Sequence, residues 1–140
     1  MTAPEDVLNE IRRHGVATYP EECCGFLLGL MGPNGNDVQA AWRAVNRNKD
    51  RRNDRYVISA DDFRSAEQTA RKLGMDIVGM YHSHPDHPAQ PSTTDLEAAT
   101  FPGYTYVIVS IKHGEAAGLT AWTLAPDRSR FLPDEITPAP

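Results

Sequence analysis

The chain has 140 residues, a formal net charge of −5 at pH 7, 40% hydrophobic residues and 24% charged residues. These values are ordinary for one soluble domain with a single core, and the acidic charge argues against a nucleic-acid partner. The apolar stretches are too short to span a bilayer, and the charges among the first twenty positions argue against a signal peptide. Cys23 and Cys24 are neighbours, which argues against a disulfide framework and favours a reducing, cytoplasmic compartment.

The first part of the chain predicts a helix followed by a buried strand. Residues 4–14 have the helical pattern, with Pro4 in the first turn and Gly15 as the C-cap. His14 is then expected to be an exposed cation at the negative end of the helix dipole. The apolar run 24–31 predicts a buried strand that ends in the turn Gly-Pro-Asn-Gly.

The middle of the chain predicts two strands, a polar loop and a long helix. We expect a strand over 38–45, a loop over 46–55, a short strand over 56–59, and a helix over 59–73 that Ser59 begins. The loop carries five basic and two acidic residues, a local charge of +3 that leaves −8 for the remainder. A solvated loop is the simplest interpretation, and the alternative is a patch that contacts an acidic or polar partner.

The second half of the chain predicts the centre of a sheet. Residues 76–84 are expected to form the central strand, and residues 104–111 and 118–124 two further strands. Residues 127–140 are rich in proline and are expected to run along the surface as a tail with a frayed end. We therefore predict a single domain over residues 1–126, followed by this tail.

Two histidines at the end of the central strand are placed to bind one metal ion. Alternate residues of a strand project to the same face, so His82 and His84 share one side while Ser83 points away. Asp95 follows beyond a proline-rich loop. Two histidines and a carboxylate are a usual ligand set for catalytic zinc, which keeps a further position for water. These three residues are therefore candidate ligands for one zinc ion.

The acidic and hydroxyl residues nearby have simpler explanations when each is taken alone. Glu21 and Glu22 stand at the entrance of the strand 24–31, where glutamates are usually solvated. Ser92 and Asp95 have the spacing of a helix N-cap and its N3 partner. The two interpretations of Asp95 are compatible, because a carboxylate in a fixed first turn can still face a metal ion.

The string His82-Ser-His84-Pro-Asp86-His87 matches the pattern H-x-H-x-D-H and resembles the metal-binding signature of the metallo-β-lactamase family. That resemblance implies a binuclear zinc hydrolase to which Asp86 and His87 contribute. However, the αββα fold of that family needs a longer chain and more histidine and aspartate ligands downstream. His113 is the only histidine that follows here.

A second pattern covers more of the chain. Its members are Glu22, His82, His84, Ser92 and Asp95. They fill every position of E…H-x-H-P-x(6)-S-x-x-D, which resembles the JAMM (MPN+) zinc metalloprotease family over about residues 5–125. The stretch Pro-Glu-Glu-Cys-Cys-Gly-Phe-Leu-Leu-Gly resembles the small prokaryotic members. The resemblance implies the MPN/JAB fold, a mixed α/β fold similar to that of cytidine deaminase, with a central curved mixed β-sheet flanked by helices.

The resemblance also implies a role for each residue of the pattern. His82, His84 and Asp95 would bind zinc. Glu22 would remove the proton of the attacking water, and Ser92 would donate a hydrogen bond to the oxyanion of the tetrahedral intermediate. Candidate substrate contacts at the rim of the site are Arg51, Arg52 and His87.

The family cleaves peptide or isopeptide bonds after the C-terminal Gly-Gly of ubiquitin-like proteins. The spans 45–56 and 84–95 are too short to hold the insertions with which eukaryotic members grip ubiquitin. We therefore expect a small β-grasp substrate of the sulfur-carrier type. The alternative from another class is a non-catalytic MPN scaffold, and a homodimer is compatible with either.

Overall fold

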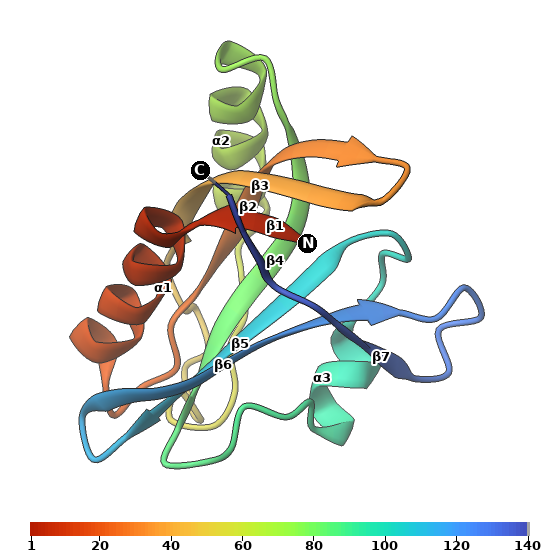
Figure 1. Ribbon diagram of the computed structural model, residues 1–140. Helices are drawn as coiled ribbons and strands as arrows, with labels where there is room; N and C mark the ends of the chain where they lie inside the picture. Colours follow the sequence, from red (N-terminus) through yellow and green to blue (C-terminus); the bar gives the residue numbers. More distant parts are fainter. Residues whose placement is uncertain (140) are drawn as a thin grey trace.

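The computed structural model describes residues 1–139, which form an eight-stranded mixed sheet and three helices. The strand order is β7-β6-β5-β4-β2-β3-β1-β8. The strands are β1 (Thr2–Pro4), β2 (Cys24–Gly32), β3 (Gly35–Ala44), β4 (Asp76–Pro85), β5 (Thr105–Lys112), β6 (Glu115–Leu124), β7 (Phe131–Asp134) and β8 (Thr137–Ala139). The helices are α1 (Glu5–Thr18), α2 (Ala60–Lys72) and α3 (Thr93–Ala98). The expectation of a curved mixed sheet flanked by helices is confirmed (Figure 1).

The central strands β2, β4 and β5 are apolar because both of their faces are covered. β4 is antiparallel to β2 and parallel to β5. Side chains alternate along β2, so that Leu27 packs in the cluster that includes α1, whereas Phe26 and Leu28 pack in the cluster that includes α2. In Figure 1, α1 lies to the left of the strands, α2 at the top and α3 at the lower right. Burial on both faces explains the continuous apolar runs in the sequence.

The end of α1 differs from the prediction. The helix continues to Thr18, so Gly15 is not its C-cap but lies inside it, where a Cβ would stand 2.8 Å from Cδ1 of Ile111. His14 is not an exposed cation: it is only 5% exposed, and its Nδ1 lies 2.7 Å from the Tyr81 hydroxyl. Burial lowers the pKa of His14 to about 4. Close packing of the helix on the sheet therefore outweighs the helix-dipole preference on which the prediction rested.

Two further expectations are wrong in detail. Residues 56–59 form no strand, whereas Ser59 begins α2 as predicted, by accepting a hydrogen bond from the Asp62 amide at 3.1 Å. The surface tail contains two edge strands: β7 pairs with β6, and β8 pairs in parallel with β1. The domain boundary at residue 126 stays a prediction. Of the final few residues, which are expected to be frayed, those at 137–139 pair in β8, and Pro140 lies outside the described residues. None of the helices within residues 1–139 is both long and apolar enough to cross a membrane.

Candidate metal centre

β4 and α3 bring three potential metal ligands together. His82 and His84 are alternate residues at the end of β4, both are buried, and their Nε2 atoms lie 3.0 Å apart. Asp95 in the first turn of α3 faces both rings, with Oδ1 3.2 Å from His82 Nε2 and Oδ2 3.1 Å from His84 Nε2. One ligand atom from each residue lies within 4.8 Å of the others. The predicted convergence of these three side chains is therefore present.

A capping box fixes the carboxylate of Asp95. The Ser92 hydroxyl accepts a hydrogen bond from the Asp95 amide at 3.0 Å, and Asp95 Oδ2 accepts one from the Ser92 amide at 2.9 Å. Burial alone would raise the pKa of Asp95, but the hydrogen bonds of the two histidines outweigh it and lower that pKa. The helix-start interpretation and the ligand interpretation thus describe the same geometry.

Neighbouring groups orient the two imidazoles. His84 Nδ1 lies 2.9 Å from the Pro88 carbonyl oxygen, so Nδ1 is the donor and Nε2 keeps its lone pair for the centre. The ring of His82 stacks on that of Tyr56, with centroids 4.8 Å apart. Oriented imidazoles and one carboxylate are a donor set that suits zinc with a position left for water. The side chains present therefore fit the ion that the sequence pattern suggests.

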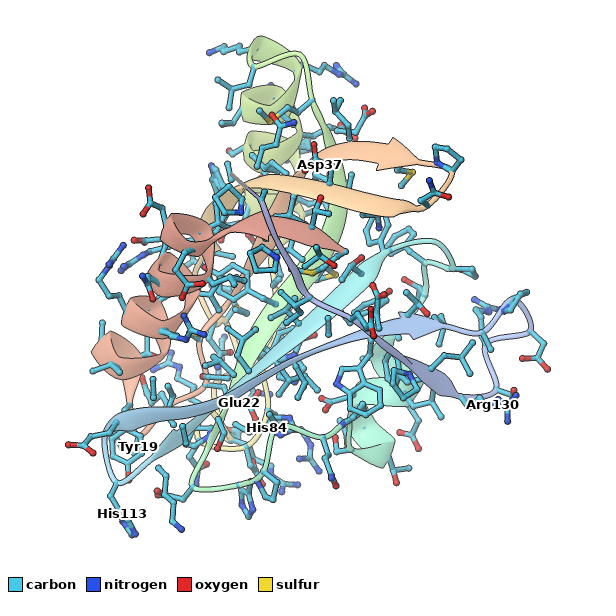
Figure 2. All side chains as sticks on the ribbon, viewed as in Figure 1. Tyr19, Glu22, Asp37, His84, His113 and Arg130 are labelled. Atoms are coloured by element: carbon cyan, nitrogen blue, oxygen red, sulfur yellow. The ribbon has the colours of Figure 1, made fainter. Side chains whose placement is uncertain are left out.

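Glu22 stands just before β2 and is the buried carboxylate next to this centre. It is 6% exposed, and burial raises its pKa to about 8. Glu22, His84 and Ser92 line one cavity of about 350 Å³. Figure 2 shows Glu22 and His84 beside each other in the lower part of the molecule. The Glu22 amide donates a hydrogen bond to the Arg52 carbonyl at 2.6 Å, so the loop 46–55 holds the entrance of β2.

The other predicted site residues lie at or outside the rim. His87 is exposed and lines the same cavity. Arg51 forms a salt bridge with Asp54, whereas Arg52 is exposed and donates from Nε to the Asn48 carbonyl at 2.7 Å. The sequence interpretation missed two further residues, since no spacing pattern marks them: Arg55, at the end of the loop, lines the cavity, and Tyr56, just after the loop, stacks on His82.

Asp86 takes no part in the centre. Its carboxylate accepts hydrogen bonds from the Tyr19 hydroxyl at 2.7 Å and from the His113 amide at 2.8 Å. Its backbone has a φ of 58°, so the residue shapes the turn after β4. A second metal ion bridged through Asp86 and His87 has no support in this geometry. The metallo-β-lactamase-like alternative is therefore not supported for this chain.

Comparison with known proteins identifies relatives of this chain. The desampylase of Haloferax volcanii is 34% identical over 108 residues, which cover 77% of this chain and 76% of that protein. The CysO-cysteine peptidase of Mycobacterium tuberculosis is 30% identical over 107 residues, covering 76% and 70% respectively. Both matches extend over most of each chain.

Solved structures agree with the fold. A protein from Salinibacter ruber is 54% identical with a TM-score of 0.80, covering 99% of this chain and 92% of that one. A JAB1/MPN domain protein from Archaeoglobus fulgidus, 18% identical, has a TM-score of 0.61 and covers 97% and 98%, which shows the fold alone. The model of prokaryotic homologs of the JAB domain matches residues 4–125. This chain therefore belongs to the prokaryotic JAB family, the small prokaryotic branch of the JAMM/MPN proteins.

Proposed function

We propose that this protein is a zinc-dependent peptidase that cleaves after the C-terminal Gly-Gly of a ubiquitin-like β-grasp protein of the sulfur-carrier type. The names of two relatives, desampylase and CysO-cysteine peptidase, support a peptidase for carriers of this type. The observation that carries the proposal is the buried carboxylate of Glu22 beside the convergent His82, His84 and Asp95.

Each residue of the centre has a proposed task. When bound by His82, His84 and Asp95, zinc supplies the Lewis acidity that lets water act as a nucleophile near neutral pH. Glu22 accepts a proton from the attacking water and passes it to the leaving amine. Its burial suits this exchange, because a carboxyl removed from solvent holds a proton more readily than an exposed one.

Ser92 is the proposed oxyanion donor. Its oxygen already accepts the Asp95 amide hydrogen, and the hydroxyl hydrogen is a further donor that can turn toward the cavity. A donor fixed by a helix cap needs little reorganisation when charge develops on the substrate carbonyl. The same turn of α3 thus contributes a ligand and an oxyanion contact.

The surroundings of the site favour a small carrier. The loop 46–55 and the turn 86–92 are short and tied to the sheet, so neither offers an extended arm that would grip a large partner. Of the two arginines predicted to dock the carrier, Arg51 is occupied by Asp54, and Arg52 keeps an exposed side chain. We therefore place the docking contact at Arg52. A cytoplasmic location and a homodimer stay predictions.

A cleavage assay read by mass spectrometry tests the proposal. The substrate is a prokaryotic β-grasp carrier extended beyond its Gly-Gly, and the enzymes are wild type, Glu22→Gln and chelator-treated wild type. We expect cleavage after Gly-Gly by zinc-loaded wild type alone, with Glu22→Gln slower by at least about 100-fold while its zinc content is unchanged. Glu21→Gln is the matched control. Because Glu21 is the exposed neighbour of Glu22, this variant should cleave the carrier at the wild-type rate.

The outcomes separate the remaining alternatives. Cleavage that survives in Glu22→Gln would assign the proton transfer to another group. A protein that binds no zinc and cleaves no extended carrier would instead be a non-catalytic MPN scaffold.

A further inference from the structure

Arg55 shares the cavity of Glu22, His84 and Ser92 but has no task in the proposed mechanism. Its side chain is half-buried, with 34% of its surface exposed. An arginine remains charged at every pH at which the protein works. A permanent cation beside the reacting groups therefore needs an explanation.

The backbone around Arg55 is built to hold it next to Glu22. The amide group of Asn46 donates to the Arg55 carbonyl at 3.0 Å and to the Glu22 carbonyl at 3.2 Å. The amide oxygen of Asn46 accepts hydrogen bonds from the Val57 and Asn48 amides at 3.2 and 3.0 Å. The side-chain amide of Asn46 thus joins the entrance of β2 to the loop that carries the arginine. The position of Arg55 is set by this network and not by its own side chain.

The guanidinium keeps most of its donors available. Within residues 1–139 its hydrogen bond is the one from Nη1 to the Asp54 carbonyl, at 2.7 Å. The Asp54 carboxylate lies 3.7 Å away and is itself held by Arg51. A guanidinium has five N–H donors arranged as a planar fork that matches a carboxylate. The side chain can therefore bind an anionic group without giving up a protein partner.

Proximity to Glu22 places Arg55 on the side of the leaving group. The proposed base passes its proton to the leaving amine, so that amine must come next to Glu22. In an α-amino acid the carboxylate is only two bonds from this nitrogen. The cavity of about 350 Å³ is near the lower end of the usual range for ligand pockets, which suits a single amino acid.

We propose that Arg55 binds the free α-carboxylate of the leaving amino acid, and that the preferred substrate is a carrier extended by one C-terminal residue. The inference rests on the proposed peptidase function. Hydrolysis adds water across the amide, so the carrier regains its C-terminal carboxylate and the released amino acid takes up the proton on its amine. An amide bond to the Nε of a lysine within a folded protein offers no carboxylate at this position and is the poorer substrate.

The test compares two adducts of one β-grasp carrier that differ only at the last group. Both carry a single alanine after Gly-Gly, one ending in a free carboxylate and the other in a carboxamide. Zinc-loaded wild type should cleave the carboxylate form with a kcat/KM about 10- to 100-fold higher, the usual effect of a charge-assisted hydrogen bond. In Arg55→Gln the ratio of the two rates should fall to about one.

Two variants serve as controls. Arg47→Gln removes the same charge from an exposed arginine of the same loop and should keep the wild-type ratio. Arg55→Lys keeps the charge but loses the planar fork of N–H donors. Its ratio of carboxylate to carboxamide cleavage should therefore lie between those of wild type and Arg55→Gln. Thermal unfolding and zinc content show whether each variant is folded, and Arg55→Lys provides the readout if Arg55→Gln is not.

Each outcome decides the assignment. Equal cleavage of both adducts by wild type, or a ratio that survives in the folded Arg55 variants, would overturn the role of Arg55 and leave the peptidase function intact. Cleavage of neither adduct by zinc-loaded wild type would overturn the proposed function and this inference with it.

Discussion

Ser92 combines a structural contact and a proposed catalytic one, and the two have different readouts. Ser92→Ala removes both the cap of α3 and the oxyanion donor, whereas Ser92→Thr keeps a hydroxyl that can serve as both. We expect Ser92→Ala to lower kcat by about 10²- to 10³-fold and to destabilise the protein by about 1 kcal/mol. Steady-state kinetics with urea unfolding measure the two effects. A kcat of Ser92→Ala close to that of wild type would remove Ser92 from the oxyanion site.

The sequence identifies those site residues whose spacing along the chain follows from the geometry of a strand or of a helix cap. Strand alternation places His82 and His84 on one face, and a helix cap places Asp95 in a fixed turn. Arg55 could not be recognised in this way. Its position depends on Asn46 and on a strand that begins far away in the chain, so nothing in the local pattern of a basic loop distinguishes it from its neighbours.

At the scale of elements, the sequence predicts the long segments and misses the short ones. β2, β4, β5 and α2 form as expected because each has a continuous apolar run or a helical period. β1, β7 and β8 have three or four residues each, and their strand character comes from partners elsewhere in the chain. The C-terminal segment contains prolines that favour a loop locally, yet it can pair at the edges of the sheet.

Docking of α1 on the sheet predicts a pH dependence of stability. His14 has a pKa of about 4 in the folded protein and an ordinary value of 6.5 when unfolded. As the pH falls below 6.5, His14 binds a proton in the unfolded chain but not in the folded one, so the unfolded state is favoured. The contribution of neutral His14 to the free energy of unfolding is complete above pH 6.5 and is lost as the pH falls toward 4. One pKa unit corresponds to about 1.4 kcal/mol, so the loss reaches about 3 kcal/mol.

The variant His14→Gln isolates this contribution, because glutamine does not titrate and can still reach the Tyr81 hydroxyl. Urea unfolding of both proteins at pH 7, 5.5 and 4 gives the difference in free energy of unfolding at each pH. We expect wild type to lose stability relative to His14→Gln as the pH falls. A difference that stays constant over this range would show that His14 is not held neutral by the fold.

At the scale of the whole molecule, the proposed zinc site joins two parts that few other contacts connect. β4 belongs to the centre of the sheet, whereas none of the residues 93–98 of α3 is buried as the structure describes them. Leu96 is partly buried and packs against the small cluster of Ala99, Tyr106 and Leu124. A metal ion shared by His82, His84 and Asp95 would therefore hold α3 against the sheet.

Removal of zinc should consequently loosen α3 more than the remainder of the protein. A ligand present at about 1,000 times its Kd stabilises the state that binds it by about 4 kcal/mol, and this stabilisation includes the local opening of α3. With chelator we expect amide hydrogen exchange in residues 93–98 to accelerate at least about 10-fold. Exchange in α2 should change little, because α2 packs through Ala66 and Ala70 in a cluster that contains no residue of α3. In His82→Ala, which keeps the capping box but lacks a ligand, exchange in α3 should be fast with and without chelator. Equal acceleration in α2 and α3 would mean that zinc stabilises the fold as a unit and is not a clamp between α3 and β4.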